Sequence, residues 1–148
     1  MMHEAVRRLT AADEMAVAEL EAQARDALAT QRGGAVHLRE QPAVVDWAGM
    51  LQRPERAVWV ATIDELVVGY LELALRPDRT AEVLQAFVLP EARELGLGDG
   101  MLRAAADAAR AAGCTALEGT ALPGDRETKN MYERAGITAR RITLWKAL

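Results

Sequence analysis

The feature that most constrains the fold is a glycine-rich segment between a strand-like run and a helix-like run. Gly96, Gly98 and Gly100 fall within the segment LGLGDG, directly after the apolar residues 80–90 and before the alanine-rich residues 101–112. Apolar positions in the later run recur at helical spacing, at Leu102, Ala105, Ala109 and Ala112. Glycine allows positive φ and close approach of another group to the backbone. The sequence therefore predicts a strand that turns into a helix here, with accessible backbone at the helix start.

A helix start of this kind favours an anion, because its first N–H groups lack partners and carry the positive end of the helix dipole. Three interpretations compete. A Walker A loop requires Gly-Lys-Ser/Thr, and the segment contains no lysine. A dinucleotide fingerprint requires Gly-x-Gly-x-x-Gly in an early βαβ unit, and these glycines have neither that spacing nor that position. A structural turn without a ligand stays open on spacing alone.

The N-terminal part predicts a strand followed by helices. Residues 3–9 alternate weakly and favour a strand. A capping-box pattern that begins at Thr10 opens a helix, which apolar spacing extends to about Ala29. Residues 30–42 contain two glycines and a proline and are expected to form a loop. A short helix is expected over residues 43–51.

The remainder of the chain alternates strands with helices. Residues 56–63 and 66–75 are rich in β-branched and aromatic side chains, and only Asp64 and Glu65 separate them, which indicates a hairpin. After the helix that Gly113 ends, we expect a strand, a helix and a final strand, over residues 114–122, 126–136 and 137–148. This order predicts an α/β fold with a mixed sheet, in a single domain over residues 1–148.

Composition excludes several classes of function. A net charge of −4 does not suit a general nucleic-acid binder, and no run approaches the ~18 apolar residues of a membrane span. The start of the chain lacks the apolar stretch of a signal peptide, and Cys114 is the sole cysteine, so we expect a cytoplasmic protein without a disulfide. His3 and His37 are the only histidines, so no metal site is expected.

Two motifs in the C-terminal half carry a family resemblance. Arg93–Gly98, with the sequence RELGLG, has the form Arg/Gln-x-x-Gly-x-Gly/Ala and stands just after VLPE at residues 88–91. Downstream, Asp125 is followed after seven residues by Tyr132, and then by glycine and an aliphatic residue. Together with the hairpin, these motifs resemble the acetyl-CoA signature of the GNAT superfamily of N-acetyltransferases. The resemblance covers essentially residues 3 to 148.

The resemblance implies a fold, a co-substrate and a reaction. The fold would be a central, mostly antiparallel sheet splayed between its fourth and fifth strands and flanked by about four helices. Acetyl-CoA would donate an acetyl group to a primary amine, with Tyr132 as general acid, and a small molecule is favoured over a protein as the acceptor. The implied coenzyme-binding residues are Phe87, Val88, Leu89, Arg93, Glu94, Leu95, Gly96, Leu97, Gly98, Asp99, Asp125 and Tyr132. The partners would be acetyl-CoA and the amine, without nucleic acid or membrane, and a homodimer is compatible with the sequence.

The sequence departs from the family pattern at two places. Asp125 stands where the family usually has an asparagine that helps to hold the pantetheine arm. Family members often carry an acid on the fourth strand, where this chain has Leu84 and Gln85. The general base is therefore open: Glu82 and Glu118 are the first candidates, Glu72 and His37 are further ones, and a water chain without a dedicated base is another solution. A non-catalytic acyl-CoA-binding or sensing domain is the alternative function.

Overall fold

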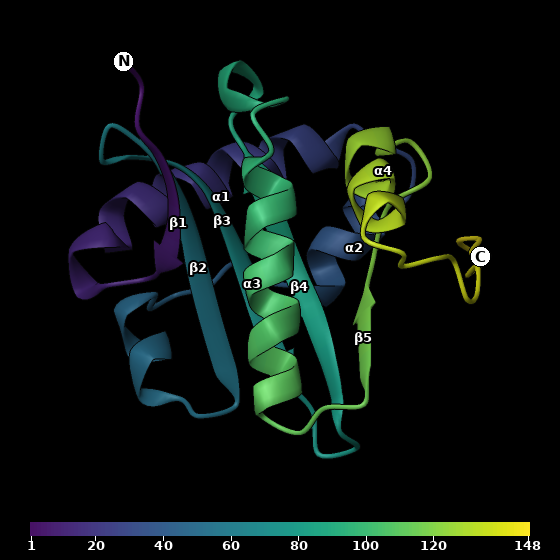
Figure 1. The fold of residues 1–148 in the computed structure, drawn as a ribbon. Coiled ribbons are helices and arrows are strands. Elements are labelled where there is room, and N and C mark those ends of the chain that lie inside the picture. The colour runs from purple at the N-terminus through teal and green to yellow at the C-terminus, as the bar shows by residue number, and fades with distance from the viewer.

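A five-stranded sheet with helices on both faces forms the framework of the computed structural model, which describes all residues from 1 to 148 (Figure 1). The strands are β1 (Glu4–Arg8), β2 (Arg56–Ile63), β3 (Leu66–Leu75), β4 (Thr80–Val88) and β5 (Ala116–Gly119). The helices are α1 (Glu14–Ala29), α2 (Gly34–Glu40), α3 (Leu97–Ala111) and α4 (Arg126–Arg134). The spatial order of the strands follows the sequence, with β1 to β4 antiparallel and β5 parallel to β4. The predicted mixed α/β fold is confirmed.

Each face of the sheet has its own apolar core. α3 crosses one face (Figure 1), and its Leu102 and Ala105 pack with Trp59 of β2. On the opposite face, Val17 and Leu20 of α1 pack with a second cluster that includes Trp47 and Tyr70. Small side chains on α3 bring that helix close to the strands. The two cores hold the sheet between α1 and α3.

β4 contains a bulge at Leu84. Glu72 pairs with Gln85 and Leu73 pairs with Val83, so Leu84 has no partner on β3. The extra residue shifts the alternation of side chains along the strand. Ala81 and Val83 before the bulge pack on the α3 side, as do Ala86 and Val88 after it. Gln85 and Phe87 consequently face α1.

The same position marks the end of pairing with β5. The last matched pair is Val83 with Gly119, so residues 84–88 of β4 have no strand on that side. The bulge bends the strand and increases its local twist, which separates it from a straight neighbour. The expected splay between the fourth and fifth strands is confirmed.

The hairpin between β2 and β3 forms as predicted. Asp64 and Glu65 both have positive φ, at 48° and 70°. Two consecutive residues with positive φ are typical of a type I′ turn, whose twist matches that of the flanking strands. The Asp64 carboxylate accepts a hydrogen bond of 2.8 Å from the backbone N–H of His3, which joins the turn to the start of the chain.

The prediction of a loop over residues 30–42 was wrong, because α2 lies within it. Gly33 has a φ of 79° and reverses the chain after α1. Gly34 is buried so closely against the Leu28 carbonyl that a side chain would not fit. The two glycines therefore form a tight joint between two helices. The short helix expected over residues 43–51 is a 3₁₀ turn at Ala48–Gln52.

The prediction of a final strand over residues 137–148 was also wrong. The segment has no regular secondary structure, and Ile142, Leu144 and Trp145 are exposed. A strand forms only where a neighbouring strand satisfies its backbone groups. The adjacent β5 is four residues long and offers little edge.

No helix of the structure combines the length and apolarity needed to cross a membrane.

The start of α1 is fixed to β1 by Asp13. Its carboxylate accepts hydrogen bonds from both terminal nitrogens of Arg7, at 2.7 and 2.9 Å, and from the Thr10 backbone N–H at 2.8 Å. The predicted capping box at Thr10 is confirmed. The hydrogen bond from Arg7 is the largest influence that lowers the pKa of Asp13, and the bonds from Thr10 add to it.

We predict that Asp13→Asn destabilises the protein by about 1–3 kcal/mol at pH 7, because charged hydrogen bonds are lost at a buried position. A carboxylate with a lowered pKa stabilises the fold above its unfolded pKa of about 3.9. That contribution disappears as the pH falls through the folded pKa. Urea unfolding of both proteins should therefore show a difference at neutral pH that vanishes in acid. A difference of equal size at all pH values would contradict this account.

Candidate functional site

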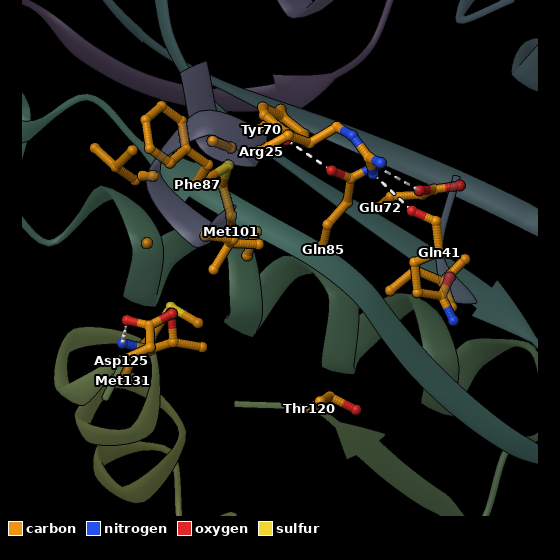
Figure 2. Close-up of a pocket in the computed structure, with 18 of the residues that line it drawn as sticks. Arg25, Gln41, Tyr70, Glu72, Gln85, Phe87, Met101, Thr120, Asp125 and Met131 are labelled. Carbon is orange, nitrogen blue, oxygen red and sulfur yellow. Dashed lines mark hydrogen bonds between the residues drawn. The ribbon is translucent and has the colours of Figure 1, made fainter. Parts of the chain in front are cut away.

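A cleft of about 1390 Å³ opens where β4 parts from β5. Its walls come from α1, α2, β3, the end of β4, the start of α3, and α4. Figure 2 shows Asp125 and Met131 on one side of it and Tyr70, Glu72 and Gln85 on the other. Residues of the N-terminal helices α1 and α2 and of the C-terminal helix α4 therefore line one cleft.

The glycine-rich segment forms the start of α3 at one end of the cleft. Gly96 has a φ of 78°, and no side chain caps the helix. Gly100 N–H is the first to bond back into the turn, to the Gly96 carbonyl at 2.9 Å, so the N–H groups of Leu97, Gly98 and Asp99 have no acceptor in the chain. A Cβ at Gly96 would meet nothing within 4 Å. The arrangement leaves free donors at the positive end of a helix, which suits an anion such as a pyrophosphate.

Two arginines lie beside these donors. Arg93 donates from Nε to the Val88 carbonyl at 2.9 Å and forms an ion pair of 2.8 Å with Glu127, so it joins the end of β4 to α4. Arg134 of α4 pairs with Asp99 in the first turn of α3 at 3.0 Å. Sequence reasoning identified Arg93 and missed Arg134, which lies two residues beyond the motif tyrosine.

The end of β4 exposes backbone groups to the cleft. Leu89 donates its N–H to the Val68 carbonyl at 2.8 Å. Successive residues of a strand direct their N–H groups to opposite sides. The N–H of Val88 therefore faces the side that β5 has left, while its carbonyl accepts from Arg93.

Asp125 is the N-cap of α4. Its carboxylate accepts from the backbone N–H of Thr128 at 3.2 Å and from the Thr128 hydroxyl at 2.6 Å. An acid at a helix start satisfies an otherwise free N–H and interacts well with the dipole. The aspartate that departs from the family pattern thus fixes the start of the helix that carries Tyr132.

Tyr132 lies beside the end of β5, at the edge of the opening between the two strands. It is 7% exposed, and a Cβ at Gly119, the last residue of β5, would overlap its hydroxyl. Burial is the main cause that raises the pKa of Tyr132, and the negative charges of Asp125 and Glu82 raise it further. A tyrosine hydroxyl carries its proton at neutral pH, so Tyr132 is a hydrogen-bond donor.

The two first candidates for a base lie on the paired part of β4 and β5. Glu82 and Glu118 are opposite each other and share Arg76, at 3.0 and 3.5 Å. Arg140 also approaches Glu118, at 3.6 Å. His37 lies on α2 at the cleft wall. Their roles as bases stay predictions.

A second polar cluster lies on the α1 side of the sheet, around Gln85. The Gln85 amide nitrogen donates to Glu21 at 2.8 Å and to Glu72 at 3.0 Å, while its oxygen accepts from the Tyr70 hydroxyl at 2.7 Å. Arg56 pairs with Glu72 at 2.8 Å. Burial, followed by the charges of Glu21 and Glu72, raises the pKa of Tyr70.

Glu21 was missed by sequence reasoning, although a signal was present. It shares the helical spacing of Val17, Leu20 and Ala24, which form the apolar face of α1. A glutamate within such a face is buried at 3% exposure. Buried carboxylates need hydrogen-bond partners, and Glu21 finds them in Gln85 and in the Val44 N–H at 3.1 Å.

Comparisons with known proteins identify the family. Residues 15–137 match the Acetyltransferase (GNAT) family. The chain belongs to the GNAT acetyltransferase family. Enzymes of this family are N-acetyltransferases that use acetyl-CoA as co-substrate, so the recognition from the two motifs is confirmed. A search of curated protein sequences found no match.

Solved structures share the fold over nearly the whole length. AAC(6')-Iy, solved with the bisubstrate analogue CoA-S-monomethyl-acetylneamine, is 17% identical, with a TM-score of 0.75 and 99% of each chain covered. The ribosomal-protein-alanine N-acetyltransferase from Brucella melitensis biovar Abortus is 19% identical, with a TM-score of 0.73 and 98% of each chain covered. At such identities the likeness shows the GNAT fold.

The residues of the cleft fit a CoA molecule. The free N–H groups at α3 match a pyrophosphate, and the open backbone at Val88 matches an extended arm with amides. The structure contains no group of three or more His, Cys, Asp or Glu side chains placed to hold a metal ion.

We predict that Gly119→Ala destabilises this GNAT enzyme by about 1–3 kcal/mol, because the new Cβ would overlap the Tyr132 ring and force it to move. Gly124→Ala is the matched control, since its Cβ would meet only the Gln31 side-chain oxygen, at 3.6 Å. Urea unfolding of both variants makes the comparison. Equal stability of the two variants would show that Tyr132 does not occupy this position.

Proposed function

We propose that this enzyme transfers the acetyl group of acetyl-CoA to a primary amine on a small molecule. The observation that carries the proposal is the set of unpartnered N–H groups at the start of α3, which open into a cleft that Tyr132 and the buried Glu72 also line. A phosphate-binding helix start, a proton donor and a proton acceptor in one cleft are the groups that acyl transfer from a CoA thioester to an amine requires.

The chain's own residues would divide the binding of acetyl-CoA between two elements. The amides from Leu95 to Asp99 would hold the pyrophosphate, with Arg93 and Arg134 contributing positive charge. The backbone of Phe87 to Leu89 would pair with the pantetheine arm in the manner of an added strand. Asp125 would act through its cap of α4, which orients Tyr132.

The chemistry requires proton transfer at two places. An alkylammonium with a pKa near 10 must lose a proton before it can attack, and the thiolate that leaves must gain one. Acetyl-CoA, when bound, supplies the thioester carbonyl. The Val88 N–H faces the cleft and would stabilise negative charge on that carbonyl oxygen. Tyr132 would protonate the departing sulfur, because a tyrosine hydroxyl carries its proton at neutral pH.

The shape of the acceptor side supports a small molecule. α1, α2 and the segment around residues 41–46 line it, together with Tyr70 and Gln85. The two structural neighbours named above act on an aminoglycoside and on a ribosomal protein, as their names state. A concave site lined by these elements suits a compact amine.

The direct test is release of free thiol from acetyl-CoA with a panel of primary amines and N-terminal peptides. We expect turnover with at least one small amine and less with the peptides. A protein that binds CoA but acetylates none of the amines would favour the sensing alternative. Faster reaction with peptides than with every small amine would contradict the proposed substrate class.

We predict that Gly96→Glu raises the Kd of CoA by at least about tenfold, or 1.4 kcal/mol, because it places a carboxylate beside the pyrophosphate. Gly113→Glu is a matched control: both glycines have positive φ, 78° and 86°, and a Cβ at either would meet nothing within 4 Å. Gly113 follows the far end of α3, about 22 Å away. Calorimetry on both variants measures the effect. Equal weakening by both would attribute it to backbone strain and contradict the pyrophosphate site.

We predict that Tyr132→Phe lowers kcat by at least about tenfold with little change in acetyl-CoA affinity, since general acid catalysis typically contributes about 10²–10⁴-fold. The ring and its packing remain, and only the donor is lost. The loss should shrink with an acyl donor whose leaving thiol is more acidic. Steady-state kinetics under conditions where chemistry limits turnover decide the question. An unchanged kcat would make Tyr132 a packing residue.

A further inference from the structure

Gln85 occupies the part of β4 where the family often carries an acid, and the structure shows what surrounds it. Its amide nitrogen donates to two carboxylates. One belongs to Glu21 of α1, and the other belongs to Glu72, the residue that pairs with Gln85 on β3. The separation in sequence is 64 residues for one contact and 13 for the other. Figure 2 shows Gln85 beside Glu72, with the Tyr70 hydroxyl on its other side.

An amide at position 85 can make all of these hydrogen bonds, and an ionised acid could not. Gln85 uses its nitrogen to donate to two carboxylates and its oxygen to accept from Tyr70, so its hydrogen-bonding groups are all engaged. A glutamate here would add a third carboxylate and could donate to neither of the others. Like charges so close together in a buried site are strongly unfavourable. The site therefore still contains a buried carboxylate, which Glu72 of the neighbouring strand β3 provides in place of a residue on β4.

Glu72 is the carboxylate of the pair that reaches the cleft. It lies in the cleft wall together with Tyr70 and Gln85, whereas Glu21 lies behind them, held by Gln85 and the Val44 N–H. Each oxygen of Glu72 accepts one hydrogen bond, from Arg56 or from Gln85. A carboxylate oxygen has two acceptor sites, so each oxygen can accept one more. Arg56 and Gln85 also hold the side chain in one orientation.

We propose that Glu72 is the general base of this enzyme and that Gln85 and Glu21 are positioning residues that hold it, an inference that rests on the proposed acetyl transfer. Glu72 pairs with Gln85, three residues before Val88, which corresponds to about 10 Å along the strand. That separation leaves room for the acceptor amine and water between Glu72 and the Val88 N–H. The proton passes from the amine through water to the carboxylate.

Glu72 and Tyr132 together account for every proton that the reaction moves. The acceptor ammonium gives one proton through water to Glu72, and its freed electron pair forms the N–C bond. The C–S bond breaks, and the sulfur takes the proton of Tyr132. The second proton of the nitrogen restores Tyr132, and Glu72 returns its proton to solvent. The products are the amide, the free thiol and one proton.

The test compares E72Q with D13N, using the best amine of the panel and its alkoxyamine analogue. Both variants remove a buried carboxylate that is paired with an arginine, but Asp13, at the start of α1, and Arg7, on β1, lie outside the cleft. With the alkylamine, E72Q should lower kcat by about 10²–10⁴-fold, as expected for loss of a general base. With the alkoxyamine, which is already neutral at pH 7, the loss should shrink below about tenfold. D13N should stay within about threefold of wild type with both acceptors, although it lowers stability.

The outcomes separate the inference from the proposed function. If the wild type releases no thiol with any amine, acetyl transfer and the inference fall together. If the wild type acetylates an amine and E72Q loses kcat by the same factor with both acceptors, Glu72 has only a structural role and the inference fails. The inference also fails if D13N shows the same dependence on amine basicity as E72Q. E72D retains a carboxylate and should recover part of the loss, and CoA affinity of each variant, measured by calorimetry, reports whether it is folded.

Discussion

The whole site depends on the place where β4 stops pairing with β5. The bulge at Leu84 shifts the register against β3, and pairing with β5 ends one residue earlier, at Val83. A sheet that remained closed would use the backbone of residues 84–88 for strand pairing and would leave Tyr132 no room. Because the strands separate, Val88, the start of α3 and Tyr132 all line one cleft. The binding and the chemistry that we propose both follow from this interruption of the sheet.

The bulge also determines which side chains reach the acceptor side. It turns Gln85 toward α1, where the amide joins Glu21 and Glu72 and the Tyr70 hydroxyl. Two carboxylates close together in a buried site are costly unless donors satisfy them. Gln85, Arg56 and the Val44 N–H provide those donors. The cluster therefore ties α1, β2, β3 and the segment before the Ala48–Gln52 turn to the part of β4 that lines the cleft.

Local signals made part of this structure predictable from the sequence. The glycine segment, the capping box at Thr10 and the spacing of Asp125 and Tyr132 each lie within a short window, and the family resemblance depended on the same windows. The convergence of Glu21 and Gln85 could not be predicted, because it joins residues 64 positions apart. No glycine or other residue signal near Leu84 indicates that β4 contains a bulge there. The expected strand at residues 137–148 had the right residues but no neighbouring edge long enough to pair with.

The central claim is that the coenzyme binds in the opening between β4 and β5, with its pyrophosphate on the first turn of α3. Amide hydrogen exchange, followed by NMR with and without CoA, tests it most directly because the proposed contacts are backbone N–H groups that have no acceptor in the protein. We expect CoA to slow exchange at Leu97, Gly98 and Asp99, and at Val88, far more than elsewhere in the sheet. Saturating CoA that leaves these four amides unchanged while it protects another surface would contradict the account.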